Sequence, residues 1–323
     1  MLKNGWRRRG EKLRTYNRLL VTPLLDVKFR ISTPIELGHG YFIWKKEFSI
    51  REDLKMWKDD NKRSLFSESL LENLEESKYW LIAHYESPEL NIDDTDDIDD
   101  NVRNIAKMLL VLFRIVRLSR LFEYAQLTYT DGNGNRIISG IEYSFKSEVY
   151  AAEHELQTEY IYTDEDIEKT RKIFDNFYIH LVDGQVKEGR IQSSLLFLKI
   201  ASETYYIYVR LVNMSIALES IFSTSRHELK YRISQRVAFF LGNNSPNRTE
   251  IYKNMKTIYD LRSDVVHGGV LKKDKIEKLN EYLPLLEEYL KLSIIKILEK
   301  TDLIDIFNNN EKIDNFFDSL ILD

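Results

Sequence analysis

The sequence has 323 residues, no cysteine, 12% aromatic residues and a formal net charge of −5. Without cysteine, the protein has no disulfide framework, no thiolate nucleophile and no cysteine-ligated zinc or iron–sulfur cluster, and a reducing, cytoplasmic location fits best. The longest apolar run near the middle of the chain, residues 109–113, is far shorter than the roughly 20 residues of a membrane-spanning helix, so we expect no membrane partner. Residues 1–30 lack the apolar stretch of a secretion signal.

Charge is distributed unevenly along the chain. The net charge is +7 in residues 1–30, −12 in 31–190, +5 in 191–300 and −5 in 301–323. An acidic protein thus contains two basic segments, and basic segments are where a polyanion would bind. The first of them contains the run Trp6-Arg7-Arg8-Arg9, which is typical of single-stranded nucleic-acid binders. Pairing with the acidic segment inside the fold is the alternative.

The first 160 residues combine strand and helix patterns, which predicts an α+β region. The segment Asp131-Gly132-Asn133-Gly134-Asn135 has the composition of a hairpin loop. Residues 89–100 contain seven acidic residues and no basic one, which favours a solvated acidic loop over a cation site. The expected strands are 41–44, 124–130 and 136–145, and the expected helices are 61–77 and 101–119.

A helical pattern begins at Thr163, because Thr163 followed by Asp166 forms a capping box. Residues 191–222 are apolar on nearly every side, which predicts one central, buried helix. The next helix is expected to open with Ser225 and Glu228 and to end at Gly242.

Two more long helices follow. One starts at Ser245-Pro246, with the proline at its first position, and stops at Gly268-Gly269. The last carries an apolar seam over 276–297 and is expected to bend at Pro284. The predicted fold class is therefore α+β and predominantly α-helical. A mixed α/β amino-terminal region over residues 1–160 is followed by a four-helix bundle within 161–323.

Arg262 occupies an unusual place in this bundle. At about 100° per residue it falls within about 20° of Ile251, on the apolar stripe of its own helix. A guanidinium there must pair with an acid or face a cleft or subunit interface, and Glu219, set among apolar residues, is the expected partner. His267 lies about 140° from Arg262, in the last turn, where the helix dipole favours the imidazolium form. The two side chains converge only if the helix end unwinds or if two copies meet across a two-fold axis.

The pattern Arg262-x4-His267 at the end of a late helix resembles the motif of HEPN nucleases. Residues 213–222, the helix with Arg236, and the run IYDLRSDVVHGG at 258–269 are together similar to the ApeA-like HEPN subgroup of bacterial antiphage proteins. The resemblance covers residues 191–300, about a third of the chain.

The resemblance implies metal-independent RNA cleavage, without a cofactor, in a composite site at a HEPN homodimer interface. His267 would act as general base or acid on the ribose 2′-hydroxyl or the 5′-oxygen, because imidazole titrates near neutral pH. Arg262 would stabilise the phosphorane-like charge. Ser263 stands where many family members have Asn, Asp or His, with Asp264 one residue later. Gly269 stands where one branch has a tyrosine that antitoxins modify, so we do not expect that regulation.

Each of these residues also has a structural interpretation. For Arg262 it is a salt bridge with Glu219 that fixes the register of the bundle, and for His267 it is capping of helix carbonyls. Asp264 is expected to orient His267, with exposure and no role as the alternative. Ser263, Asp264 and His267 do not indicate a serine hydrolase, because no nucleophile elbow or oxyanion loop accompanies them.

Three further basic residues are candidate RNA contacts. Arg232 and Arg236, four residues apart, either face phosphate together or form ion pairs inside the fold. His227, near a helix start, either meets phosphate or belongs to a solvated cap. The cluster Glu153-His154-Glu155 is expected at the surface rather than around a metal, because adjacent side chains point in different directions.

The expected function is that of a HEPN-type RNA endonuclease in bacterial antiphage defence, in abortive infection or as a toxin. Residues 1–160 would then recognise a protein or phage-derived trigger. The alternative is a catalytically silent HEPN module that binds RNA or a protein partner as a regulator or scaffold.

Overall fold

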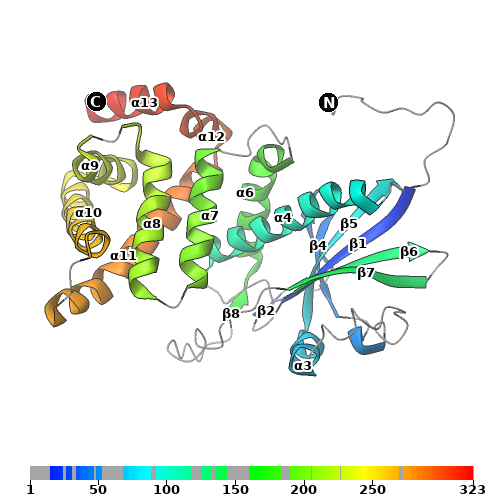
Figure 1. Ribbon diagram of the computed structural model, residues 1–323. Coiled ribbons are helices and arrows are strands. Elements are labelled where there is room, and N and C mark those ends of the chain that lie inside the picture. Colours follow the sequence, from blue (N-terminus) through cyan, green and yellow to red (C-terminus); the bar gives the residue numbers. More distant parts are fainter. Residues whose placement is uncertain are drawn as a thin grey trace. The chain divides into compact units, whose positions relative to one another are not determined.

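The chain divides into two compact units, and each is described by itself. The amino-terminal unit comprises residues 1–107 and 121–144, and the helical unit comprises 108–120 and 145–323. Residues 108–120, which the sequence pattern grouped with the amino-terminal region, thus belong with the carboxy-terminal helices. The α+β, predominantly helical class is confirmed. The computed structural model (Figure 1) describes residues 15–24, 27–30, 34–46, 49–52, 68–88, 92–117, 125–132, 135–143, 160–182, 189–204, 206–225, 227–268 and 272–322.

A six-stranded antiparallel sheet, of order β3-β4-β5-β1-β6-β7, forms the amino-terminal unit. Strand β1 pairs along its whole length with β5, from Thr15 opposite Pro88 to Leu24 opposite Tyr79. The predicted hairpin is confirmed, because β6 and β7 pair up to Gly132 opposite Asn135. The strand bounds are β1 (Thr15–Leu24), β2 (Val27–Phe29), β3 (Ile35–Gly38), β4 (Tyr41–Lys45), β5 (Tyr79–Pro88), β6 (Ala125–Gly132) and β7 (Asn135–Tyr143).

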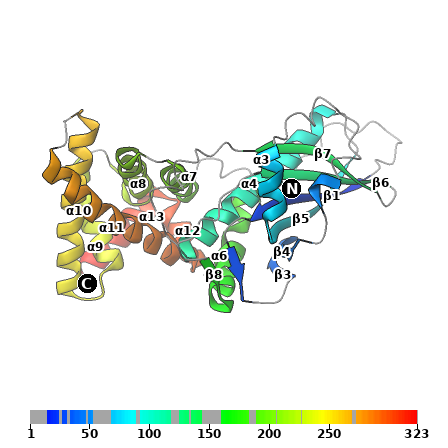
Figure 2. The same cartoon turned by 90° about the horizontal axis from the view of Figure 1, so that it is seen from below.

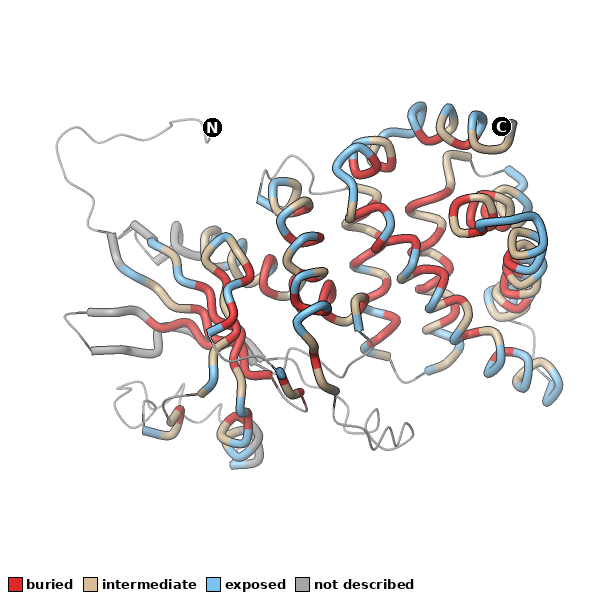
Figure 3. The backbone as a smooth tube through the Cα atoms, turned by 180° about the vertical axis from the view of Figure 1, so that it is seen from behind, coloured by how far each residue is buried: buried red, intermediate tan, exposed pale blue. Residues whose placement is uncertain are grey.

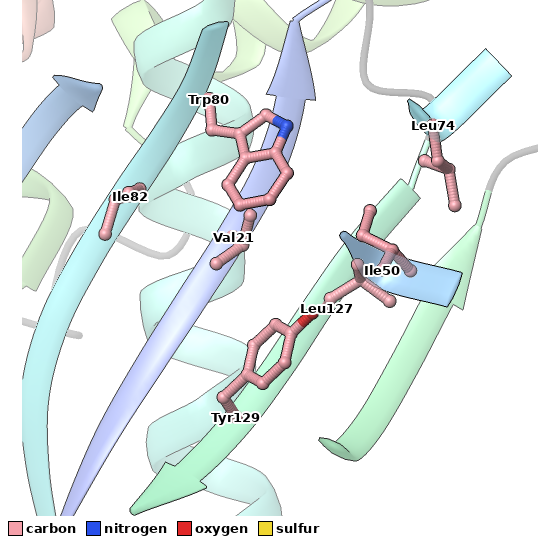
Figure 4. Close-up of a cluster of buried hydrophobic side chains, with 7 residues drawn as sticks. All are labelled: Val21, Ile50, Leu74, Trp80, Ile82, Leu127 and Tyr129. Carbon is pink, nitrogen blue, oxygen red and sulfur yellow. The ribbon is translucent and has the colours of Figure 1, made fainter. Parts of the chain in front are cut away.

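Successive side chains along each strand point to opposite faces of the sheet, and other elements of the unit cover both faces. Residues 92–107 of helix α4 (Ile92–Val116) cover one face, where the Tyr41 hydroxyl donates to the Val102 carbonyl at 3.1 Å and Arg103 donates to Thr128 Oγ1 at 3.2 Å. The other face packs against residues 49–52 and helix α3 (Glu68–Glu76). Figure 4 shows the cluster there: Val21, Ile50, Leu74, Trp80, Ile82, Leu127 and Tyr129.

The acidic segment 89–100 was expected as a loop, and this prediction was wrong, because the backbone is helical from Ile92 onward. Negative charge near a helix amino terminus interacts favourably with the helix dipole, so a run of aspartates does not oppose the first turns. The predicted helix at 101–119 is the remainder of α4, which ends at Val116. The predicted helix at 61–77 corresponds to α3, of which the structure describes Glu68–Glu76.

The helical unit is larger than the four-helix bundle predicted, because eight helices follow Thr163 in the described part of the chain. Helix α8 contacts α7, α9, α10 and α11, and α10 contacts both α9 and α11 (Figure 2). The bounds are β8 (Tyr160–Tyr162), α6 (Asp164–Val182), α7 (Arg190–Glu203), α8 (Ile207–Phe222), α9 (Leu229–Leu241), α10 (Ser245–Val266), α11 (Lys273–Leu298), α12 (Thr301–Phe307) and α13 (Asn310–Leu322).

The single central helix predicted over 191–222 is two helices, α7 and α8, separated at 204–206. Thr204 and Tyr206 have extended backbones, and β-branched and aromatic residues lose side-chain freedom in a helix, which weakens the helix there. The apolar pattern on all sides arises because each helix also exposes apolar side chains, among them Leu196 and Val209. Six of the 14 residues of α7 and seven of the 16 residues of α8 are buried, so the two helices are buried to a similar extent. Figure 3 shows how buried and exposed residues alternate along the helices.

Helix ends follow the predicted signals in part. The Thr163 capping box is confirmed, because the Thr163 backbone NH donates to Asp166 at 2.9 Å and the Asp166 NH donates back to the Thr163 hydroxyl at 3.3 Å. Gly242 ends α9 as predicted, and the position has no room for a larger residue, since a Cβ there would lie 2.5 Å from Arg248 Cγ and 2.6 Å from the Ala238 carbonyl oxygen. The prediction that Ser225 and Glu228 together open α9 was wrong, because Glu228 itself is the N-cap residue, in a left-handed conformation with φ of 52°.

The last long helix, α11, confirms the predicted seam. Leu279, Leu283, Leu286, Leu290 and Ile297 are all buried along it, and Pro284 lies inside the helix on its exposed side. Ser293, the residue that interrupts the seam, is buried and donates its hydroxyl to the Tyr289 carbonyl at 2.7 Å. None of the described helices is long and apolar enough to cross a membrane.

Candidate functional site

Helix α10 positions both residues of the candidate catalytic pair. It begins after Asn244, whose side chain accepts from the Asn247 NH at 3.0 Å, so Pro246 takes the second rather than the first helical position. It ends at His267, whose NH donates to the Ser263 carbonyl at 3.1 Å. Gly268 then adopts φ of +72°, a left-handed conformation that glycine accepts without strain. The local sequence therefore fixes where the helix stops and where the histidine lies.

Arg262 makes the contact expected of it. Its guanidinium lies 3.3 Å from Glu219 Oε1 on α8, and the two side chains are 24% and 19% exposed. Neither Arg262 Nε nor Glu219 Oε1 has a hydrogen-bond partner, so the two groups form an ion pair without an aligned hydrogen bond. The guanidinium is therefore held by charge, and its buried Nε makes no hydrogen bond.

Burial dominates the electrostatics around this ion pair. It raises the pKa of Glu219, and the positive charge of Arg262 offsets that rise in part. The neighbouring Tyr259 hydroxyl is buried, and burial together with the negative charge of Glu219 raises the pKa of Tyr259 well above its ordinary value. Tyr259 is therefore neutral at physiological pH, and Arg262 and Glu219 are the only charged members of this group of three.

His267 is exposed at the end of the helix, and its imidazole makes no hydrogen bond or ion pair with any residue that the structure describes. Asp264, expected to orient it, instead accepts a hydrogen bond from Lys275 Nζ of α11 at 2.7 Å. The carboxylate is drawn to the lysine because α10 and α11 pack together. Ser263 is exposed.

Within one chain, Arg262 and His267 leave the helix in different directions. Helix α10 is intact through Val266, so the unwinding that would bring them together is not seen. Five residues along a helix turn the side chains about 140° apart. A site that uses both groups on one phosphate therefore needs a second copy of the chain.

The candidate RNA contacts on α9 are engaged inside the fold. Arg236 is only 5% exposed, forms an ion pair with Asp314 of α13 and donates to the Phe222 carbonyl at 2.7 Å. Arg232 lies 3.2 Å from the same Asp314 carboxylate. The intramolecular alternative therefore describes the contacts that Arg232 and Arg236 make in the fold, and their contact with RNA phosphate stays a prediction. His227 is exposed and remains a candidate.

Sequence reasoning missed the partners Lys275 and Asp314, which lie 11 and 78 residues from Asp264 and Arg236. No local pattern links residues so far apart. The described residues contain no group of three or more His, Asp or Glu side chains that could hold a metal. The segments Trp6–Arg9 and Glu153–Glu155 lie outside the described residues.

Comparison with known proteins gives no match to a family model, to a curated protein or to a solved structure.

Proposed function

We propose that the chain is a HEPN-type RNA endonuclease in which Arg262 and His267 carry the chemistry. The observation that carries the proposal is the contrast at the end of α10. The His267 imidazole is exposed and makes no hydrogen bond or ion pair with the described residues, whereas Arg262 is 24% exposed and paired with Glu219. An exposed imidazole can act as a general acid or base on a substrate, and the positive charge of a guanidinium can stabilise phosphate.

In the proposed reaction the ribose 2′-oxygen attacks the adjacent phosphorus while His267 removes its proton. The bond from phosphorus to the 5′-oxygen breaks, and the same His267, now in its imidazolium form, gives the proton to that oxygen. The products are a 2′,3′-cyclic phosphate and a 5′-hydroxyl, so no water and no redox partner is consumed. Arg262 stabilises the added charge on the non-bridging oxygens.

The site is a composite one in this proposal, formed by two copies of the chain in a homodimer. The divergence of Arg262 and His267 on one helix supports this arrangement, because a single copy presents them on different sides. Residues 191–300, which include α10, carry a net charge of +5, which suits a polyanionic substrate.

The biological role in this proposal is antiphage defence, abortive infection or toxicity inside the cytoplasm. The sheet-containing amino-terminal unit would recognise the protein or phage-derived trigger. A second candidate function is a catalytically silent module that binds RNA or a protein. The ion pair between Arg262 and Glu219 favours it, because an arginine engaged by a neighbouring helix can be purely structural.

The test is cleavage of labelled RNA by the purified chain and by two variants. His267→Ala removes the proton-transfer group, and we expect activity to fall about 10²- to 10⁴-fold. Arg262→Ala removes charge stabilisation, and we expect a loss of about 10²- to 10³-fold. The ends of the products are then checked for a cyclic phosphate and a 5′-hydroxyl.

Two matched controls separate chemistry from general effects. His84→Ala removes an exposed histidine of β5, and Lys253→Ala removes an exposed positive charge from α10 itself. Both should cleave like the parent chain. Equal activity in all five proteins, or none in the parent across diverse RNAs, would contradict the nuclease. Salt-dependent RNA binding without cleavage would instead support the silent module.

A further inference from the structure

The outer side of helices α9 and α10, which pack side by side (Figure 1), combines aromatic rings with cations. Lys256 Nζ of α10 lies 5.5 Å from the centre of the Tyr252 ring. The Arg248 guanidinium lies 4.7 Å from the centre of the Phe239 ring of α9. The Tyr231 ring of α9 is nearly perpendicular to the Tyr252 ring, and the two ring centres are 6.3 Å apart. We call these five residues the α9–α10 row.

Tyr231 is the most accessible ring of the row, at 51% exposed. Exposed apolar residues are common on protein surfaces, so exposure alone does not mark a site. Here the exposed ring lies beside the half-buried Tyr252, and the exposed Lys256 lies over that second ring. Accessible aromatic rings next to positive charges are the combination on which single-stranded nucleic acids stack their bases, while their phosphates contact the cations.

The two cations of the row have no acidic partner among the residues that the structure describes. Lys256 contacts a ring, and Arg248 contacts a ring and donates to a backbone carbonyl. The exposed acid nearest along α10, Asp260, is already paired with Lys230 of α9. The other exposed acid of α10, Glu250, points about 120° away from Lys256 around the helix. The row therefore has two uncompensated positive charges, which suit a polyanion.

The row is aligned with His267 along α10. Eleven residues separate Lys256 from His267, so at 100° per residue the two side chains point within about 20° of the same direction. At 1.5 Å per residue they are about 17 Å apart along the helix axis, the length of a few nucleotides. A strand whose bases stack on Tyr231 can therefore reach His267 along one face of α10.

We propose that the α9–α10 row binds single-stranded RNA and leads it to His267. Tyr231 would stack on an unpaired base, and Lys256 and Arg248 would contact the flanking phosphates. The strand has to be single, because the bases of a duplex are stacked on one another and are not free to stack on a tyrosine. The inference rests on the proposed function and names the form of RNA that the same site takes.

The experiment measures binding of a short, labelled, single-stranded 2′-O-methyl oligonucleotide to the full chain, because this probe has no 2′-hydroxyl and reports binding without cleavage. Tyr231→Leu keeps an apolar side chain and removes the ring, and we expect affinity to fall about 5- to 150-fold. Tyr231→Trp should keep it. Lys256→Gln should reduce the slope of log K against log salt by about 0.7. The matched controls Tyr208→Leu on α8 and Lys278→Gln on α11 remove exposed side chains and should bind like the parent.

Cleavage assays on the same variants separate this inference from the nuclease itself. Oligonucleotide binding that depends on Tyr231, in a chain that cleaves no RNA, would support the row and contradict the nuclease. Cleavage with the same KM in the parent and in Tyr231→Leu would overturn the row and leave the nuclease standing.

Three further results would overturn the row: tighter binding of a duplex of the same sequence, no saturable binding of the oligonucleotide by the parent, or equal affinity in all variants. Polyglutamate is the probe for an acidic protein partner. Binding of polyglutamate that Lys256→Gln weakens and Tyr231→Leu does not, without oligonucleotide binding, would assign the surface to such a partner instead.

Discussion

Arg262 and His267 lie five residues apart and yet experience different surroundings. Arg262 is fixed by a carboxylate on another helix, whereas the His267 imidazole lies in solvent. Burial raises the pKa of Glu219 more than the positive charge of Arg262 lowers it. The ionised form of Glu219 is therefore less favourable in the folded protein than in water. Glu219 thus holds the Arg262 side chain in place, while the buried Nε of Arg262 makes no hydrogen bond.

Glu219→Gln tests this balance. The raised pKa of Glu219 means that the folded protein binds a proton more tightly than the unfolded chain, so the contribution of Glu219 to stability falls as pH rises through its ordinary value of 4.5 and the raised folded value. The glutamine variant does not titrate. We therefore expect the free energy of unfolding of the variant to rise relative to that of the parent between pH 4 and pH 7. At pH 7 the two free energies should differ by no more than about 1 kcal/mol. Urea denaturation at several pH values measures the difference.

Glu250→Gln, an exposed acid on α10, is the matched control and should show no such trend. If the parent gained stability over Glu219→Gln as pH rose, the pKa of Glu219 would be lowered by Arg262, and the pair would be a strong structural salt bridge instead.

Among elements, α6 shows how a local signal determines a boundary. The Asp166 carboxylate accepts from the Thr163 backbone NH at 2.9 Å and from Arg117 Nε at 2.6 Å. Burial alone would raise the pKa of Asp166, but these hydrogen bonds and the charge of Arg117 outweigh burial and lower it. Both interactions are strongest when the Asp166 carboxylate is ionised.

Asp166→Asn should therefore destabilise the helical unit at neutral pH by about 1–2 kcal/mol, through the weakened cap and the lost ion pair. A lowered pKa means that this stabilisation is present above the ordinary value of 3.8 and is lost as pH falls through the folded value, so parent and variant should converge in acid. Thermal unfolding across this range measures it. Asp164→Asn, an exposed acid in the same turn, should cost little, and an equal cost would contradict the assignment.

Sequence predicted those elements whose signals are local. The capping box at Thr163, the hairpin around 131–135 and the glycine end of α10 depend on neighbours within a few residues. The break between α7 and α8 was missed because periodicity does not show where a continuous apolar pattern changes helix. The contact between Arg262 and Glu219 was predictable because both lie on the apolar faces of packed helices, whereas the pairing of Arg236 with Asp314 depends on where α13 docks.

For the whole molecule, the key consequence is the number of copies that one active site needs. An intact α10 separates Arg262 and His267 by about 140°, so the proposed chemistry is divided between subunits. The same separation would be found if Arg262 were purely structural and His267 were an exposed histidine without a related role. Activity of mixed dimers distinguishes these two cases, because only a shared site can be rebuilt from two damaged chains.

We expect inactive Arg262→Ala and inactive His267→Ala chains to regain activity when they are co-refolded. A mixed dimer has one site with both residues intact, contributed by different subunits, and random pairing makes half of the dimers mixed, so the mixture should reach about a quarter of the parent rate. Labelled RNA cleavage measures the rate, and sedimentation confirms that dimers form. Chains that carry both substitutions, mixed with either single variant, are the control and should stay inactive. Mixed dimers that form and remain inactive would show that each chain acts alone.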